Sequence, residues 1–244
     1  MSWAKLNKLT KLVREPNYLS ALAKHRVAAA IEHVDAVNFV APATLLDIGA
    51  NKGQFSTLVR TNAPGAVIHA FEPLPAGADR YAALFAGDSR TTLHRVALGE
   101  NSRTAVFHVT DRADSSSLLK PGEGQKSAFG VSTSSTIEVQ VKPLDQVLKL
   151  DDLPHPVMVK IDVQGAELEV LRGMGDLSQV DAIYVELSFV ELYEGQPLFE
   201  DVQKYLDERG FELRGVFNQA FTANFGPTQA DCLFVQRKAQ GAAQ

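Results

Sequence analysis

The sequence of 244 residues contains a single cysteine, Cys232. One thiol cannot form an internal disulfide, so a small scaffold held together by disulfides is excluded, and the apolar run around Cys232 places it in the expected core. No apolar run reaches the roughly 20 residues that span a bilayer, and the N-terminus lacks the apolar centre of a signal peptide. We therefore expect a cytoplasmic protein.

An excess of positive charge is also missing. The net charge is −5 and the isoelectric point is near 5.7, whereas binding to nucleic acid depends on clustered lysines and arginines. The 6 histidines show no H-x-x-x-H spacing, and one cysteine allows no C-x-x-C pair. No G-x-S-x-G turn is present either. These absences argue against a nucleic-acid partner, a zinc site built from protein ligands and a serine hydrolase.

The apolar residues that are present predict one α/β domain. With 45% hydrophobic residues, the chain is long enough for one such core and too short for two. Short apolar runs separated by segments of helical spacing are typical of buried parallel strands. The expected core strands are residues 44–48, 66–71, 91–98, 157–161 and 182–187, followed by a closing antiparallel pair at 211–217 and 231–236.

Two further regions flank or interrupt this pattern. Residues 1–43 predict an N-terminal helical extension before the domain of residues 44–244, with a basic amphipathic helix at 3–13 and a second helix at about 18–38. The first helix is either a lid or docking helix with solvated lysines, or a peripheral contact with an anionic membrane. Strands at 104–110 and 136–142 predict a small β insertion, and the Ser- and Gly-rich residues 111–135 between them predict a mobile lid or a disordered loop.

A glycine-rich turn follows the first expected strand. Gly49 and Gly53 would let a ligand approach the backbone, the free N–H groups at the helix start favour an anionic group, and Asp47 can accept a hydrogen bond from a cation or a hydroxyl. The dinucleotide fingerprint G-x-G-x-x-G fits poorly because Asn51 occupies its second glycine position. A zwitterionic ligand that carries a nucleoside would suit this turn.

The ends of the next strands add three candidate contacts for such a ligand. Glu72, followed by Pro73, closes the second strand, where an acidic residue is well placed to hold both ribose hydroxyls. The backbone around Ala97 and Leu98 would flank an adenine. Residues 114–118 could donate serine hydroxyls, or form a polar lid that makes no contact.

The fourth strand ends in the sequence K-I-D-V-Q-G-A-E-L-E-V-L-R-G, at residues 160–173. Alternation along a strand puts Lys160 and Asp162 on the same face, so their side chains can meet. The pair is either catalytic or a structural ion pair. Gly165 is expected to open the following helix and Gly173 to cap it.

Taken in order, these motifs resemble the FkbM family of methyltransferases. The resemblance rests on D-I-G-A-N-x-G-Q, A-F-E-P, V-A-L-G, S-S-S-L, the block at 160–173, Y-V-E-L-S-F and D-C-L-F-V, and it covers about residues 44–237. It implies the Rossmann-like class I methyltransferase fold, a three-layer α/β sandwich with a seven-stranded, mostly parallel sheet and an antiparallel last strand. It also implies S-adenosylmethionine as cofactor and S-adenosylhomocysteine as product. Gln164 departs from the family pattern, because many members carry Glu there.

The resemblance also implies a set of site residues. The catalytic candidates are Asp162, as general base, and Lys160. The expected cofactor contacts are Asp47, Gly49, Ala50, Asn51, Gly53, Gln54, Glu72, Pro73, Ala97, Leu98, Ser116, Ser117 and Asp162. The expected substrate contacts are Gln164, Glu186, Glu191, Tyr193 and Gln196, the last three in a segment that would face the acceptor. A Mg²⁺ ion held by Asp162 and Glu186 is a minor alternative.

The expected reaction is methyl transfer to a hydroxyl, with a sugar of a surface glycan or glycolipid as the first hypothesis for the acceptor. A polyketide or another natural product is the alternative acceptor. A cofactor-binding module without turnover and a nicotinamide-dependent enzyme are the alternative functions. A homodimer is an open expectation.

Overall fold

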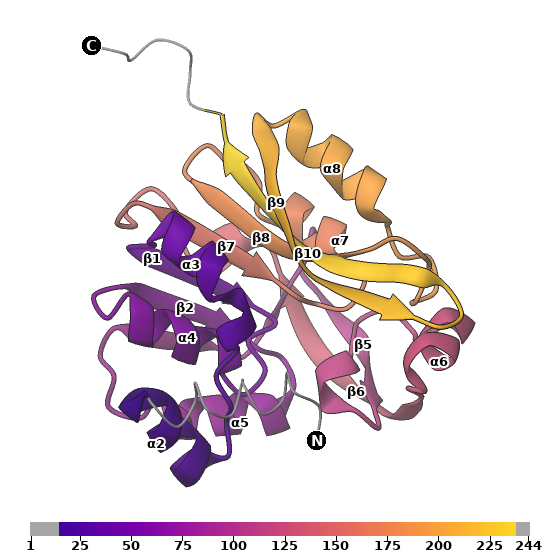
Figure 1. Ribbon diagram of the computed structural model, residues 1–244, viewed down its shortest axis with the longest axis horizontal. Helices are drawn as coiled ribbons and strands as arrows, with labels where there is room; N and C mark the ends of the chain where they lie inside the picture. Colours follow the sequence, from indigo (N-terminus) through magenta and orange to yellow (C-terminus); the bar gives the residue numbers. More distant parts are fainter. Residues whose placement is uncertain (1–14, 238–244) are drawn as a thin grey trace.

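A computed structural model describes residues 15–237, which form a seven-stranded sheet between two layers of helices (Figure 1). Its strands lie in the order β3-β2-β1-β7-β8-β10-β9, and only β10 runs antiparallel to its neighbours. Their bounds are Thr44–Ile48 (β1), Val67–Phe71 (β2), Thr91–His94 (β3), Val157–Ile161 (β7), Ala182–Ser188 (β8), Phe211–Thr222 (β9) and Gly226–Gln236 (β10). The predicted fold class is confirmed. The expected helix at 3–13 and the tail at 238–244 lie outside the described residues.

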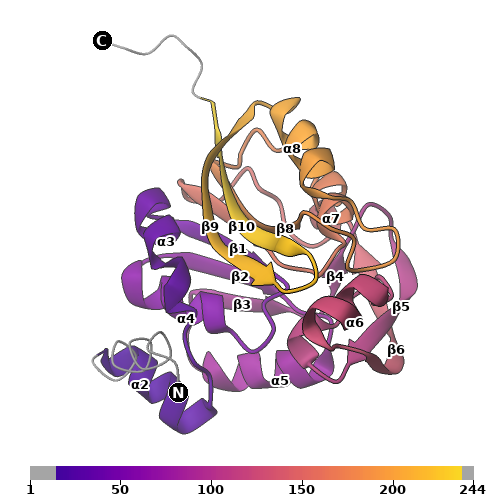
Figure 2. The ribbon, with the colours of Figure 1, turned by 45° about the vertical axis from the view of Figure 1, so that its right-hand side comes forward.

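Helices cover both faces of the sheet, which explains why its strands are continuous apolar runs. On one face lie α2 (Pro16–His25), α3 (Val34–Val40), α4 (Gln54–Asn62) and α5 (Pro75–Leu84), and on the other lie α7 (Glu167–Gly173) and α8 (Phe199–Asp207) (Figure 2). Neighbouring residues of β1 serve opposite layers: Leu45 packs with α3 and α4, and Leu46 packs with α7 and α8. No helix within residues 15–237 is long and apolar enough to cross a bilayer.

The N-terminal segment differs from the single helix expected at 18–38. Helix α2 ends where Arg26 adopts a left-handed conformation, with φ of 55°. An irregular stretch and a 3₁₀ turn, η1 (Ile31–His33), then precede α3. Tyr18 and Val37 pack into the same apolar cluster as Leu58 of α4. The extension therefore shares the core of the sheet domain, and its irregular stretch reaches the site described below.

A second, three-stranded sheet forms the insertion, in the order β4-β6-β5. It contains β4 (Ala97–Leu98), β5 (Arg103–Thr110) and β6 (Thr133–Lys142). The strand predicted at 91–98 is thus divided, because its last two residues leave the main sheet and pair with β6.

The segment at 111–135 is folded, so the expectation of a disordered loop was wrong, whereas its alternative, a mobile lid, stays a prediction. It holds a 3₁₀ turn, η2 (Ala113–Ser115), and a helix, α6 (Glu123–Phe129). Its glycine at 124 permits close packing, because a Cβ there would meet the carbonyl oxygen of Glu191 at 1.9 Å. The turn of the β9–β10 hairpin also lies against α6, where Asn224 Nδ2 donates to the carbonyl oxygen of Ser127 at 2.9 Å (Figure 2).

Gly173 does not cap α7 in the expected way. It is the last residue of that helix, and the cap residue that follows, Met174, has ordinary right-handed angles. A Cβ on Gly173 would meet the carbonyl oxygen of Gly99 at 2.2 Å. The missing side chain therefore lets α7 press against the turn after β4, which holds Ala97 and Leu98 in place.

Candidate active site

A cavity of about 480 Å³ opens at the carboxyl ends of the parallel strands. The strand order reverses between β1 and β7, and in open α/β sheets ligands bind in the crevice at such a reversal. The volume lies within the range of small-molecule sites. The wall is built from the β1–α4 turn, the ends of β2, β7 and β8, strand β4, residues 112–118 and the N-terminal stretch near His33.

The β1–α4 turn supplies one wall of the cavity. Of the expected contacts in this turn, those that line the cavity are Gly49, Ala50, Asn51 and Gln54. Asp47 does not reach it. Its carboxylate is fully buried beneath the turn, where Oδ2 accepts from Ser56 Oγ at 2.6 Å and Oδ1 lies 3.5 Å from Lys160 Nζ. Asp47 thus binds Ser56 near the start of α4 and pairs with Lys160 of β7. This corrects its assignment as a ligand contact.

The two glycines of the turn are required by packing within the protein. Gly49 has φ of 78°, and a Cβ on it would meet the carbonyl oxygen of Asp162 at 1.9 Å. Gly53 has φ of 92°, and a Cβ there would meet Phe85 at 2.9 Å. Gly53 is not in the cavity wall, so its role is to seat α4 against α5.

Glu72 lies where β2 ends, and its carboxyl is buried in the cavity wall. Oε2 accepts from the Asn51 N–H at 2.7 Å, and Oε1 accepts from the Leu74 N–H at 2.8 Å. Burial raises the pKa of this carboxyl to about 7, against the opposing effect of the two backbone donors. Each oxygen keeps a second lone pair, so the group can still accept from two adjacent hydroxyls. Pro73 also lines the cavity, as expected.

Beside Glu72 the wall becomes apolar. Ala97 and Leu98, both expected to flank a planar group, line the cavity together with Ile48, Phe71, Val96 and Phe107. Ser116 lines it too. Ser117 is fully buried elsewhere, where its hydroxyl donates to the Val163 carbonyl at 3.2 Å and accepts from the Leu119 N–H at 2.9 Å. The expected contact from Ser117 is therefore replaced by a role in fastening residues 115–119 to the end of β7.

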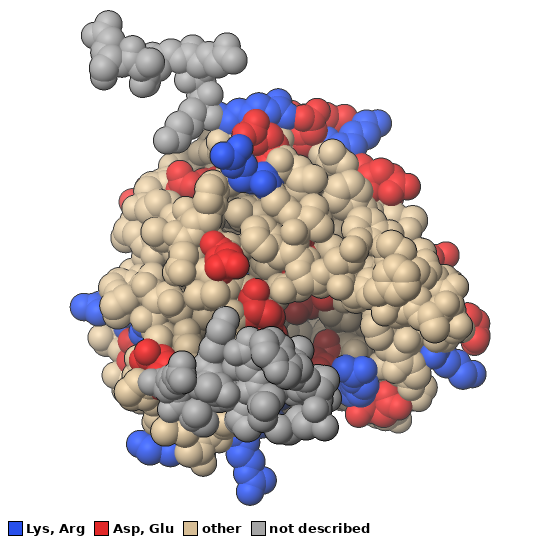
Figure 3. Space-filling model, in the orientation of Figure 1, with Lys and Arg blue, Asp and Glu red and all other residues tan. Residues whose placement is uncertain are grey.

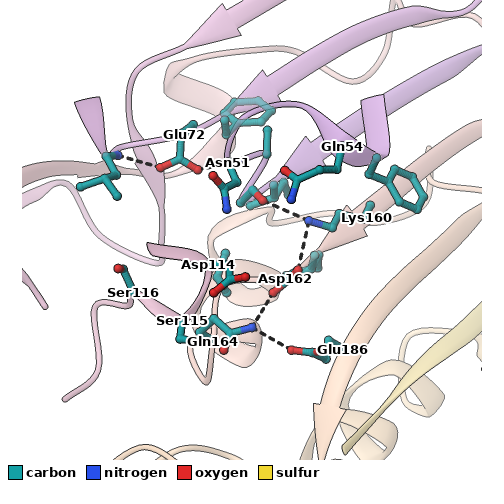
Figure 4. A pocket seen from close by; sticks show the side chains of 18 of the residues that line it. Asn51, Gln54, Glu72, Asp114, Ser115, Ser116, Lys160, Asp162, Gln164 and Glu186 are labelled. Carbon is teal, nitrogen blue, oxygen red and sulfur yellow. Dashed lines mark hydrogen bonds and ion pairs between the residues drawn. The ribbon is translucent and has the colours of Figure 1, made fainter. Parts of the chain in front are cut away.

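Lys160 and Asp162 meet, as strand alternation predicted. Lys160 Nζ lies 3.6 Å from Asp162 Oδ2 and donates to the Gly49 carbonyl at 3.1 Å (Figure 4). Burial by itself lowers the pKa of the Lys160 ammonium, but the surrounding carboxyl groups, with Asp162 and Asp47 first among them, together outweigh burial, and the pKa is raised. Lys160 is therefore a fixed positive charge in the wall.

Asp162, Glu186 and Asp231, which we call the acidic row, lie at the same level on neighbouring strands. Asp231 pairs with Glu186 in the β8–β10 register, and Asp162 follows the residue that pairs with Val185. Gln164 Nε2 donates to both Asp162 Oδ1 and Glu186 Oε2 at 2.8 Å (Figure 4). Burial, and then the charges of Asp162 and Asp231, raise the pKa of Glu186 well above its usual range.

The pair considered for Mg²⁺, Asp162 and Glu186, accepts from the same amide nitrogen of Gln164. A cation between the two carboxylates would have to displace that donor. Within residues 15–237, no group of three or more His, Cys, Asp or Glu side chains is arranged to hold a metal ion.

The far end of the row carries a cluster that sequence reasoning missed. His33 Nδ1 lies 3.2 Å from Asp231 Oδ2 and 3.0 Å from the Tyr184 hydroxyl, and Asn218 Nδ2 donates to Asp231 Oδ2 at 2.9 Å. His33, Tyr184 and Asp231 all line the cavity. These side chains come from η1, β8, β9 and β10, and no local spacing in the sequence links them.

Three expected substrate contacts do not reach the cavity: Glu191, Tyr193 and Gln196. Their segment closes on itself, because Gln196 Oε1 accepts from the N–H groups of Leu192 and Tyr193, and Glu191 Oε1 accepts from that of Gly195. The Tyr193 ring is buried, with its hydroxyl 2.9 Å from Gln164 Oε1. Of the five expected substrate contacts, Gln164 and Glu186 line the cavity.

The strand order, the glycine turn and the acidic residue at the end of β2 together define a class I, Rossmann-like methyltransferase. The sequence model of the Methyltransferase FkbM domain family matches residues 47–213 of this chain. The chain therefore belongs to this family.

Three named methyltransferases are similar to the chain in sequence. The 2-O-methyltransferase NoeI of Sinorhizobium fredii is 29% identical over 201 residues, which cover 79% of each chain. The methyltransferase sdnD of Sordaria araneosa is 28% identical over 73% of this chain and 77% of its own. The hexuronic acid methyltransferase AglP of Haloferax volcanii is 31% identical over 67% of this chain and 61% of its own.

Proposed function

We propose that the protein transfers a methyl group from S-adenosylmethionine to a hydroxyl, with a sugar of a surface glycan or glycolipid as the acceptor. One observation carries the proposal: a single cavity has a buried carboxyl group, Glu72, on one side and the Lys160–Asp162 pair on the other (Figure 4). The first side suits a nucleoside, and the second suits a hydroxyl that must lose its proton.

The residues present fit this cofactor. Glu72 would accept from the ribose hydroxyls, because both of its oxygens keep a free lone pair after binding the backbone. The apolar wall at Ala97 and Leu98 suits the face of an adenine. Asn51 and Gln54 offer polar groups at the start of α4. When bound, S-adenosylmethionine supplies an electrophilic methyl group on a sulfonium.

Asp162 is the residue we assign as the base. Its half-buried carboxylate is held by Lys160 and Gln164 and faces the cavity. A positioned base of this kind contributes roughly 10² to 10⁴ to the rate. Holding the hydroxyl in line with the methyl group contributes up to about 7 to 11 kcal/mol more. Lys160 anchors Asp162 and closes the floor of the cavity through its bond to the Gly49 carbonyl.

A sugar acceptor is supported by the polar character of the cavity on this side and by two relatives. NoeI is named as a 2-O-methyltransferase and AglP as a hexuronic acid methyltransferase. Several polar groups line the cavity beyond Asp162, among them Gln164, Glu186, Gln229 and Asp231. Such a wall suits a ligand rich in hydroxyls better than an apolar polyketide surface.

Mass spectrometry of the surface polysaccharide, with and without the gene, tests the acceptor. We expect loss of one O-methyl sugar when the gene is deleted, and an unchanged O-methyl profile would rule the glycan acceptor out.

Calorimetric titration with S-adenosylhomocysteine and with NAD tests the cofactor separately. Tighter binding of NAD would favour a nicotinamide enzyme. Retention of labelled S-adenosylmethionine without transfer to any glycan or lipid would favour a binding module.

A further inference from the structure

We infer that the acceptor half of the cavity selects a neutral or positively charged polyhydroxylated ligand, such as a neutral sugar or an amino sugar, and disfavours a ligand that carries a carboxylate. This inference rests on the proposed function, because it describes the acceptor of the same site. It separates the protein from a uronic acid methyltransferase.

The first observation is the acidic row. Parallel and antiparallel neighbours in a sheet lie about 4.8 Å apart, so Asp162, Glu186 and Asp231 form three carboxyl groups side by side in the cavity wall. Like charges that face each other across strands are unfavourable, and with burial this repulsion raises the pKa of Glu186, which disfavours its charged form. A second carboxylate brought in by a ligand would add to this repulsion, whereas hydroxyl or ammonium donors would relieve it.

The second observation is that the donors near the row are already engaged. Gln164 Nε2 donates to Asp162 and Glu186, and Asn218 Nδ2 donates to Asp231. The Lys160 ammonium is shared between the Gly49 carbonyl and its carboxylate neighbours. This part of the wall therefore presents mainly hydrogen-bond acceptors to a ligand.

The third observation points to a ligand independently of the row. Gln125 of α6 lines the cavity and is only 2% exposed, yet its Oε1 has no hydrogen-bond partner. Its Nε2 donates to the Tyr193 hydroxyl at 3.1 Å, and the one hydrogen of that hydroxyl is directed to the Ser115 carbonyl and Gln164 Oε1. Leaving a buried acceptor without a donor is unfavourable. A donor group on the acceptor molecule would satisfy Oε1.

Apart from Lys160, whose ammonium is engaged by Asp47 and Asp162, the positively charged side chains near the site are Arg26, Lys52 and Arg112, all of which line the cavity. Arg26 and Arg112 are exposed, and Arg112 Nε lies 3.7 Å from Asp114 Oδ1. Figure 3 shows acidic side chains at the hollow on this face of the molecule. Exposed cations are screened by water and salt, so they offset little of the repulsion at the partly buried row.

The test uses the full chain saturated with S-adenosylhomocysteine and three probes that share one ring. These are methyl α-glucopyranoside, its 2-amino-2-deoxy derivative and its uronic acid, titrated by calorimetry or ligand-observed NMR at neutral pH. We expect the uronate to bind at least about tenfold more weakly than the neutral glucoside, and the amino sugar to bind as tightly or more tightly. Asp231→Asn should reduce the discrimination against the uronate severalfold.

Gln125→Leu should weaken the binding of the neutral glucoside about tenfold, because the hydrogen-bond acceptor for one of its hydroxyls is lost. Gln203→Leu, the same change on an exposed position of α8, is the matched control and should leave all three affinities unchanged. Uronate binding as tight as that of the neutral glucoside, or no binding of any probe to the saturated protein, would overturn the inference. Failure of S-adenosylhomocysteine itself to bind would contradict the proposed function instead.

Discussion

The Tyr193 hydroxyl lies 2.9 Å from Gln164 Oε1, although the two residues are 29 positions apart in the chain. This contact fixes the amide of Gln164 so that its nitrogen faces Asp162 and Glu186. Gln164 also has φ of 58°, a left-handed conformation that a residue other than glycine rarely adopts. A tyrosine outside the cavity thus orients a polar side chain inside it.

Tyr193→Phe should lower the free energy of unfolding by about 1 to 3 kcal/mol, because the Ser115 carbonyl, Gln125 Nε2 and Gln164 Oε1 each lose a buried partner. Urea unfolding measures this loss. Tyr205→Phe is the control, since the Tyr205 hydroxyl makes one long bond of 3.3 Å to the Leu171 carbonyl. Equal small losses in the two variants would show that the Tyr193 network does not stabilise the fold.

Glu72→Ala should weaken the binding of S-adenosylhomocysteine by about 1.5 to 3 kcal/mol, the range for hydrogen bonds to a charged group. Isothermal titration calorimetry gives the affinity. The residue follows the last residue of β2, so the fold should persist, and circular dichroism can check this. Unchanged affinity would refute the assignment of Glu72 to the ribose.

The affinity for S-adenosylhomocysteine should rise with pH. In the free protein the pKa of Glu72 is about 7, and hydroxyl donors favour its charged form, so binding lowers that pKa and releases protons near neutrality. Between about pH 6 and about pH 8 the affinity should increase up to roughly tenfold.

Glu72→Gln serves as the control for this pH dependence and should abolish the increase. The control matters because burial also raises the pKa of Glu167 to about 7. The Glu167 carboxyl accepts from the Gly165 N–H and lies outside the cavity wall. A pH profile that Glu72→Gln leaves unchanged would assign the titration to another group.

Asp162→Asn should reduce turnover by roughly 10² to 10⁴ and leave cofactor affinity within a few-fold, if Asp162 is the base. Single-turnover kinetics with the acceptor found in the glycan comparison measures the first effect, and calorimetry measures the second. A main loss in cofactor affinity would mean that Asp162 holds the methionine end of the cofactor. If turnover, cofactor affinity and thermal stability all fell together, Asp162 would be only a structural partner of Lys160.

Gly173→Ala should destabilise the protein by about 1 to 3 kcal/mol, because the new methyl group would overlap the Gly99 carbonyl and push α7 from β4. Gly65→Ala is the matched control, since no atom lies within 4 Å of a Cβ there. That change should be neutral or slightly stabilising. Thermal melts of both variants decide the matter, and equal melting temperatures would contradict the packing role of Gly173.

Much of the fold could be predicted from local patterns in the sequence. The strands at 44–48 and 157–161 coincide with β1 and β7, since a buried strand and its turn residues leave a short-range pattern. The meeting of Lys160 and Asp162 also followed from alternation along one strand. A disordered loop was one expectation for residues 111–135 because glycines that allow close packing look the same in a sequence as glycines of an unfolded segment.

The sequence by itself determined most of the core strands, a mostly parallel sheet with an antiparallel last strand through the family resemblance, and the placing of Glu72 and Asp162 at strand ends. Only the tertiary structure decided which polar side chains face the cavity. It buried Asp47 and Tyr193, brought His33 beside Asp231, and left Gln125 Oε1 without a partner. The physical reason is that periodicity and turn chemistry act over a few residues, whereas the direction of a polar group depends on partners supplied by distant strands and helices.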